Sequence, residues 1–149
     1  MPTSRSSKPR IVITMGDPSG IGPEITLRAL ASPKIRGLAD FIVVGDRFII
    51  EKAARELGLK FTASLIDMDN VPRKIFAYGK SDPAFGKASM QYIDKALYII
   101  GNNDADSLVT APINKSSINA AHYKGFEGHT EYLAEKTHAK NFAMMFVGK

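Results

Sequence analysis

The stretch Ile11-Val12-Ile13-Thr14-Met15-Gly16-Asp17-Pro18-Ser19-Gly20-Ile21-Gly22-Pro23-Glu24 joins a short apolar run to the start of an amphipathic segment. The apolar run predicts a strand over residues 11–14, and the segment after it predicts a helix over residues 23–31. Pro23 suits the first turn of a helix, where its missing N–H would have no partner in any case. A strand, a glycine-rich turn and a helix in this order are typical of a ligand site in an α/β fold, because free N–H groups at a helix start favour anions.

Three glycines in this stretch allow the main chain to turn sharply and allow a ligand to approach it closely. Their spacing, Gly16-x-x-x-Gly20-x-Gly22, is not the dinucleotide fingerprint G-x-G-x-x-G. It is not a P-loop either, since no Gly-Lys-Ser/Thr follows. On this ground alone, a ligand-binding turn and a purely structural connector remain equal alternatives.

Outward from this stretch, apolar runs alternate with helical patterns, which predicts a parallel α/β architecture. Asp46 is the predicted N-cap of the second helix, and Gly58 is the residue that stops it. Residues 67–83 form a long irregular connection with room for one short strand at most. Further strands are predicted over residues 41–44, 61–66, 107–110 and 142–147, and further helices over residues 46–57, 86–100, 114–121 and 130–137.

The composition argues against several classes of protein. The chain has 149 residues, 44% of them hydrophobic, 23% charged and none of them cysteine. No apolar stretch approaches the roughly 18 residues that a membrane helix needs, so we expect no membrane partner. The absence of cysteine excludes disulfides and thiolate nucleophiles and agrees with a cytoplasmic protein.

The net charge of +5 comes partly from the first ten residues, which contain Arg5, Lys8 and Arg10 and no acid. No basic stripe with interleaved aromatic residues follows, so we expect no nucleic-acid partner. Residues 1–9 are predicted to be a disordered basic tail, and residues 10–149 to form the α/β portion. A mild positive bias also suits a phosphorylated metabolite.

A second motif, Val109-Thr110-Ala111-Pro112-Ile113-Asn114-Lys115, follows the strand predicted over residues 107–110. It lies at a carboxyl end of the sheet, where open α/β sheets bind their ligands. Lys115 is therefore a candidate catalytic residue, placed to meet a phosphate or a developing oxyanion. The alternative is a solvated lysine on a loop.

A third motif, Gly128-His129-Thr130-Glu131, places an imidazole and a hydroxyl beside the free N–H groups of a predicted helix start. Such a group can hold a phosphate or orient a hydroxyl substrate. The alternative is that Thr130 caps the helix while His129 lies on the surface. His122, His129 and His138 do not follow zinc-ligand spacing, so we predict no metal ligand within this chain.

Taken in order, these motifs resemble those of the 4-hydroxythreonine-4-phosphate dehydrogenase family of vitamin B6 biosynthesis. The resemblance extends from about Arg10 to the end of the chain. It implies an α/β fold like that of isocitrate and isopropylmalate dehydrogenases, with a mostly parallel sheet flanked by helices. Two such domains flank a cleft in that fold. The matching segments are residues 15–24, 79–88, 110–115 and 128–135.

The resemblance implies an activity, namely the NAD(P)-dependent oxidation and decarboxylation of 4-phosphooxy-L-threonine in pyridoxal phosphate biosynthesis. His129 and Thr130 match the substrate-contacting pair of the family. The cofactor, NAD or NADP, is expected at the glycine turn, on Gly16, Asp17, Gly20 and Gly22. A divalent metal (Zn, Mg or Co) is held in the family by three histidines, which are expected beyond residue 149, and the full-length enzyme is expected to be a homodimer.

The chain stops two residues after the predicted strand 142–147, although a parallel strand normally continues into a crossover. We therefore expect an N-terminal fragment of a longer two-domain dehydrogenase, inactive by itself. Glu127 stands where the family more often has Pro or Thr, which leaves open a sister dehydrogenase acting on threonate or erythronate 4-phosphate. A non-catalytic module that binds a phosphorylated metabolite is the alternative from another class of protein.

Overall fold

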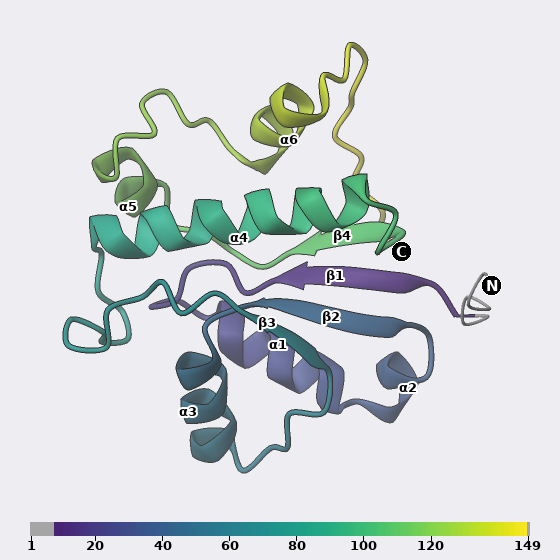
Figure 1. Ribbon diagram of the computed structural model, residues 1–149, viewed down its shortest axis with the longest axis vertical. Coiled ribbons are helices and arrows are strands. Elements are labelled where there is room, and N and C mark those ends of the chain that lie inside the picture. The colour runs from purple at the N-terminus through teal and green to yellow at the C-terminus, as the bar shows by residue number, and fades with distance from the viewer. Residues whose placement is uncertain (1–7, 149) are drawn as a thin grey trace.

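The computed structural model describes residues 8–148, and its centre is a four-stranded parallel sheet (Figure 1). The strand order is β3-β2-β1-β4, so β1 and its neighbour β4 are far apart in sequence. This arrangement confirms the predicted α/β class. The strands are β1 (Arg10–Thr14), β2 (Asp40–Gly45), β3 (Ser64–Asp67) and β4 (Ser107–Thr110).

Six helices are found in the described residues: α1 (Gly22–Ala31), α2 (Pro33–Arg36), α3 (Arg47–Leu57), α4 (Pro83–Gly101), α5 (Lys115–Ala120) and α6 (His129–Thr137). The short helix α2 was not predicted, because four residues are too few to show a helical period. Helix α4 begins three residues before its predicted start. Asp82 caps it by accepting a hydrogen bond from the Ala84 N–H at 3.0 Å, and Pro83 occupies the first turn.

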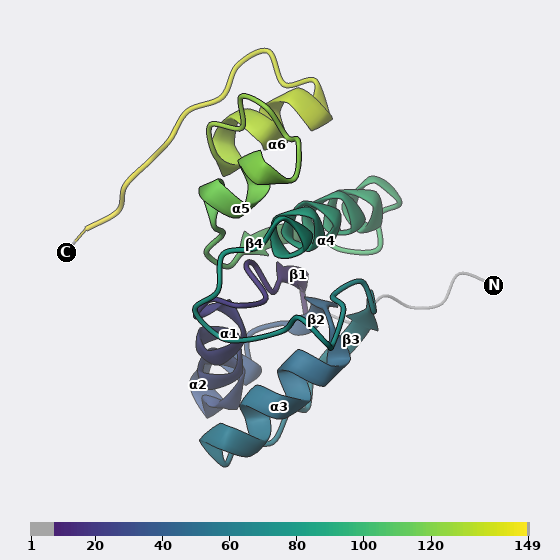
Figure 2. The ribbon, with the colours of Figure 1, turned by 90° about the vertical axis from the view of Figure 1, so that its left-hand side faces the viewer.

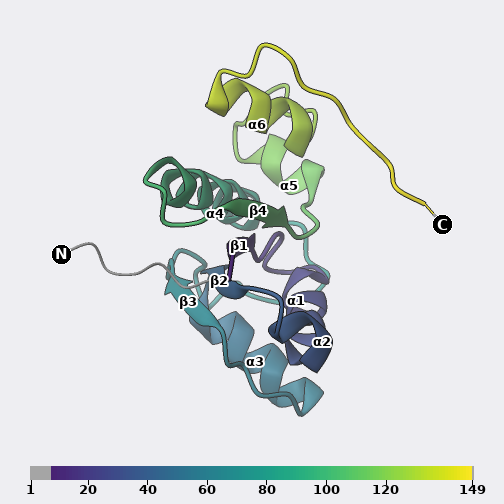
Figure 3. The same cartoon turned by 90° about the vertical axis from the view of Figure 1, so that its right-hand side faces the viewer.

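The helices cover both faces of the sheet. Helices α1 and α3 pack together on one face, and α4 lies against β1, β4 and β2 on the other (Figure 3). This change of face follows from the strand order, since the chain moves outward from β1 to β3 and then returns to the far side of β1. The carboxyl ends of β1 and β4 therefore form the topological switch point, the usual ligand position in such sheets.

Two hydrophobic clusters hold these layers together. The larger one lies between the sheet and its helices and includes Val12, Val43, Val44 and Ile49, all fully buried. The smaller one, formed by Met90, Ile93 and Ile118 with partly buried neighbours, lies between α4 and the later helices. Helices α5 and α6 extend this second layer beyond α4 (Figure 2).

The prediction of a strand over residues 142–147 is wrong. The segment has no strand pairing, and it extends away from the helices (Figure 2). Phe146 is 88% exposed and Val147 is 87% exposed. An apolar pattern indicates a strand only where a neighbouring strand can accept its hydrogen bonds, and the described chain places none beside this segment.

The third strand starts at Ser64 rather than at residue 61. Its pairing with β2 runs from Ile42↔Ser64 to Gly45↔Asp67, and residues 61–63 have no strand partner in that register. The irregular connection over residues 67–83 is confirmed. Gly58 ends α3 in the left-handed conformation, with φ +64°, as predicted.

Asp46 occupies the predicted N-cap position of α3, but its side chain does not cap that helix. One carboxylate oxygen accepts hydrogen bonds from the N–H groups of Asn70 at 2.8 Å and Val71 at 3.1 Å. The Tyr92 hydroxyl donates to the other oxygen. Asp46 is fully buried, and this burial raises the pKa of its carboxyl despite the three donors. The side chain thus ties the end of β2 to the irregular connection and to α4.

Within residues 8–148, no helix is both long enough and apolar enough to cross a membrane. Most of the predicted basic tail, residues 1–7, lies outside the described residues.

We expect Tyr92→Phe to lower the free energy of unfolding by about 2 kcal/mol at neutral pH, because it removes a donor from a buried carboxylate. The loss should be smaller at acidic pH. The Tyr92 hydroxyl favours the ionised form of Asp46, so its removal raises the pKa further and penalises the fold only where Asp46 is ionised. Urea denaturation across this pH range measures both effects.

Tyr98→Phe is the matched control on the same helix, since Tyr98 is 62% exposed. Its effect should stay within about 0.5 kcal/mol. Equal losses for the two variants, or a Tyr92→Phe loss that does not depend on pH, would contradict the assigned role of Asp46.

Candidate functional site

The glycine turn lies at the switch point and is joined there to the second motif by main-chain hydrogen bonds. The Ala111 N–H donates to the Thr14 carbonyl at 3.1 Å, and the Asp17 N–H donates to the Pro112 carbonyl at 2.8 Å. The Met15 N–H donates to the Val44 carbonyl at 2.9 Å. The ends of β1, β4 and β2 are thus held together by the turn itself.

Gly16 and Gly22 are required by contacts within the chain. Gly16 has φ +75°, and a Cβ there would lie 2.3 Å from the Pro112 carbonyl oxygen. A Cβ on Gly22 would lie 2.0 Å from the Met15 carbonyl oxygen. Gly20 has no positive φ, and its nearest neighbour would be the Asp17 Cβ at 3.3 Å. The space beside two of the three glycines is therefore filled by the protein's own main chain.

Asp17 connects the two motifs through its side chain. It is only 7% exposed, and its carboxylate accepts a hydrogen bond from the Ser19 N–H at 3.0 Å. Burial raises the pKa of Asp17, while the Ser19 N–H and the Asn114 side chain lower it. Asn114 in turn caps α5 by accepting from the Ser117 N–H at 3.1 Å. The first and second motifs thus form one hydrogen-bonded unit.

Ser19 holds the irregular connection against the turn. Its hydroxyl donates to the Ala77 carbonyl at 2.8 Å and accepts from the Lys80 N–H at 2.7 Å. The Ser19 carbonyl accepts from the Gly79 N–H at 2.8 Å. We refer to these three hydrogen bonds as the Ser19 latch. Sequence reasoning missed this role, because nothing in the spacing of residues 19 and 77–80 indicates their contact.

Lys115 is the first residue of α5, and its side chain is exposed to solvent. The described contacts give its ammonium group no hydrogen bond and no ion pair. The structure therefore places Lys115 next to the glycine turn through Asn114, with its side chain in solvent.

His129 and Thr130 open helix α6. Gly128 is the N-cap, and no side chain caps this helix, so the alternative that Thr130 is the cap is wrong. His129 is partly buried, and its Nε2 atom is buried without a hydrogen-bond partner. Burial lowers the pKa of His129 below its usual 6.5, which keeps the imidazole neutral at neutral pH.

The structure does not bring the third motif to the first two. No side-chain hydrogen bond in the described residues joins His129 or Thr130 to the glycine turn or to Lys115. Helix α6 lies on the far side of α5 from the sheet (Figure 2). Among residues 8–148, no group of three or more His, Asp or Glu side chains could hold a metal ion. The described residues therefore form no metal site by themselves.

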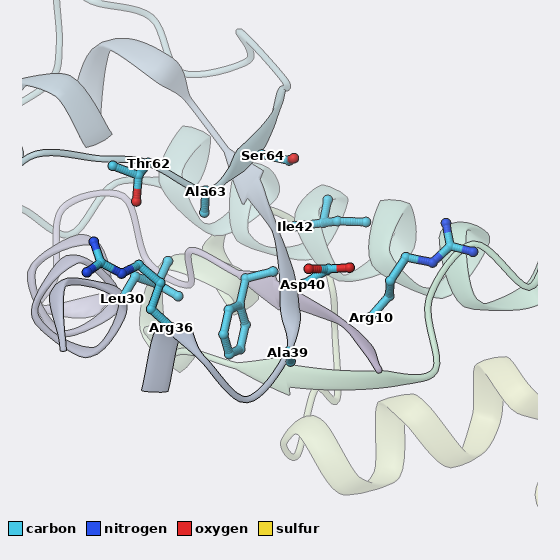
Figure 4. A pocket seen from close by; sticks show the side chains of 10 residues that line it. Arg10, Leu30, Arg36, Ala39, Asp40, Ile42, Thr62, Ala63 and Ser64 are labelled. Carbon is cyan, nitrogen blue, oxygen red and sulfur yellow. The ribbon is translucent and has the colours of Figure 1, made fainter. Parts of the chain in front are cut away.

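Two cavities can be compared with the positions of these motifs. One, of about 680 Å³, lies at the amino ends of the strands and is lined by Arg10, Arg36 and Asp40 among others (Figure 4). None of the predicted site residues lines it. Another, of about 470 Å³, lies between α1, α3 and Tyr78, and Gly20 is the predicted residue that reaches it.

Comparison with known proteins gives a consistent result. Residues 37–149 match the family described as "Pyridoxal phosphate biosynthetic protein PdxA". A 4-hydroxythreonine-4-phosphate dehydrogenase from a Synechocystis species is 35% identical over 96% of this chain and 43% of the relative. A D-threonate 4-phosphate dehydrogenase from Cupriavidus necator is also 35% identical, over 93% of this chain and 46% of the relative.

The crystal structure of a 4-hydroxythreonine-4-phosphate dehydrogenase from Burkholderia phymatum has the same fold. The TM-score is 0.88 at 30% identity, over 96% of this chain and 48% of that one. The chain thus spans less than half the length of these relatives.

We expect Gly16→Ala to lower the free energy of unfolding by about 3 kcal/mol or more, since it combines a left-handed main chain with a collision against the Pro112 carbonyl. Gly79→Ala is the matched control. Gly79 has φ +72°, but a Cβ there would meet nothing within 4 Å, so its loss should be only about 1–2 kcal/mol. Equal losses in chemical denaturation would show that close packing at the switch point contributes nothing.

Proposed function

Because this chain belongs to the PdxA family, we propose that the protein containing it is an NAD(P)-dependent dehydrogenase of a phosphorylated four-carbon hydroxy acid. The preferred substrate in this proposal is 4-phosphooxy-L-threonine, which is oxidised at its secondary alcohol and then decarboxylated. The observation that carries the proposal is the family match over residues 37–149, which contain the second and third motifs.

His129 is the residue we assign to the substrate, together with Thr130. A neutral imidazole offers one donor and one acceptor nitrogen, and the buried Nε2 has no hydrogen-bond partner among the described residues. Thr130 follows His129 in the first turn of α6. This pair can therefore orient an alcohol and hold its proton at a defined atom. We keep Lys115 as a candidate partner for negative charge on the substrate.

The cofactor, NAD or NADP, supplies the acceptor for the hydride that leaves the alcohol carbon. Gly16, Asp17 and Gly22 are buried, so we assign them to the shape of the turn rather than to direct contact. Gly20 is partly exposed and borders the cavity of about 470 Å³, so it remains the turn residue available to a ligand. The N-terminus of α1 has no side-chain cap, but Pro23 has no N–H and the Ile25 N–H donates to the Ile21 carbonyl, so few donors there are open to an anion.

We derive no step through a metal ion, because the described residues form no metal site by themselves. The proposal places metal ligands, the second domain and the homodimer contact outside these residues, in keeping with relatives more than twice as long as the matched part. A cytoplasmic location belongs to the same proposal.

D-Threonate 4-phosphate is the second candidate substrate. The relative that bears this name is as similar to the chain as the relative named for 4-hydroxythreonine 4-phosphate, at 35% identity each. Glu127 is an exposed carboxylate one residue before Gly128, where it adds negative charge near the proposed substrate site. Both compounds therefore belong in the first assay.

We expect the full-length protein, assayed with each compound and with NAD or NADP, to reduce the cofactor with at least one of the two substrates. Absorbance at the wavelength of the reduced nicotinamide measures the reaction. Binding of either compound without cofactor reduction would instead support the non-catalytic module.

In the same full-length protein, His129→Ala should raise the KM of the phosphorylated substrate about tenfold, the cost of losing one well-placed hydrogen bond. The KM of the cofactor should stay within about twofold, since His129 is assigned to the substrate alone. His122→Asn is the control, because the His122 φ of +69° suits asparagine and its side chain is exposed. Equal losses for substrate and cofactor would contradict the assignment.

A further inference from the structure

Helix α6 is held to the rest of the protein by few contacts, although it carries both proposed substrate residues. Ala134 is its one buried residue. Tyr132 and Leu133 are partly buried and pack against the cluster of Met90, Ile93 and Ile118. The orientation of this helix therefore depends on a small number of side chains.

One of these side chains makes a hydrogen bond to another helix. The Tyr132 hydroxyl donates to the Asp94 carboxylate on α4 at 2.6 Å. Its ring lies 5.9 Å from the Phe126 ring, and the Lys136 ammonium lies 5.2 Å from its centroid. Among the described side chains, this is the one hydrogen bond that joins α6 to α4.

The position of Tyr132 links this bond to His129. The two residues are three positions apart, so their side chains lie on the same face of the helix. An α-helix is rigid over one turn, and a bond that sets the rotation of α6 at Tyr132 also sets the direction of the imidazole. The buried, unpartnered Nε2 of His129 agrees with an imidazole turned toward the protein.

We propose that Tyr132 and Asp94 form a positioning pair that orients the substrate-binding end of α6. The proposal rests on the assignment of His129 to the substrate, and it adds two residues that do not themselves touch that substrate. Burial and the Asp94 carboxylate raise the pKa of Tyr132, so the phenol remains a donor throughout the range in which the enzyme would work.

The test uses full-length protein with Tyr132→Phe, which removes the hydroxyl and keeps the ring. Two readouts are compared, the KM of the phosphorylated substrate and the titration of the His129 imidazole followed by NMR. We expect KM to rise about fivefold with kcat within about twofold, as one net hydrogen bond predicts. The His129 pKa should move up toward its usual 6.5 as the imidazole leaves its buried position.

Two further variants support this test. Asp94→Ala removes the acceptor at an exposed position, so it probes the pair even if Tyr132→Phe fails to fold. Asp94→Asn keeps an acceptor oxygen and should restore most of the substrate affinity that Asp94→Ala loses. Tyr98→Phe is the control, since Tyr98 is an exposed tyrosine on α4.

If Tyr132→Phe and Asp94→Ala both fold and leave the substrate KM and the His129 titration unchanged, the proposal is overturned. A loss of thermal stability with neither readout moved would also overturn it, because the pair would then serve stability alone. The His129 titration needs no turnover. If it shifts while His129→Ala leaves KM unchanged, the positioning pair stands and the assignment of His129 to the substrate fails.

Discussion

The close contact between Gly16 and the main chain of Ala111 and Pro112 is the constraint on which the rest of the structure depends. It joins the ends of two strands that are distant in sequence, and it leaves no room for a side chain at Gly16. The side chains of Asp17 and Asn114 are hydrogen-bonded beside this contact, and Asn114 caps α5, so the start of α5 is fixed to the same point. The glycine turn is therefore first a packing element, and a ligand can use only the part of it that remains exposed.

Buried carboxylates extend this arrangement. Asp17 and Asp46 follow adjacent strands, and burial raises the pKa of each. Both accept hydrogen bonds from main-chain N–H groups that the irregular connections would otherwise leave without partners. The residues that follow the strands are thus held by side chains rather than by regular secondary structure, which is how a sheet of four short strands supports long loops.

Local patterns predicted most of the fold. The alternation of apolar runs and helical periods indicated every strand of the sheet, and Gly58 marked the end of α3. The failures concern contacts between distant segments. The apolar pattern of residues 142–147 could not reveal that the described chain gives it no neighbour, and the position of Asp46 could not reveal that its carboxylate serves Tyr92 and the loop instead of its own helix. The motifs indicated the edge of the sheet at which a ligand is expected, but not the separation of α6 from that edge.

The Ser19 latch has a consequence for how the protein opens. Residues 77–80 have no regular secondary structure, yet the N–H groups of Gly79 and Lys80 are bound to a buried serine at the switch point. Exchange of these two amides requires the segment to leave Ser19, so we expect slower deuterium exchange there than at the amides of exposed loops without such hydrogen bonds. For the same reason, we expect proteases to cut at residues 79 and 80 more slowly than in exposed loops without such hydrogen bonds.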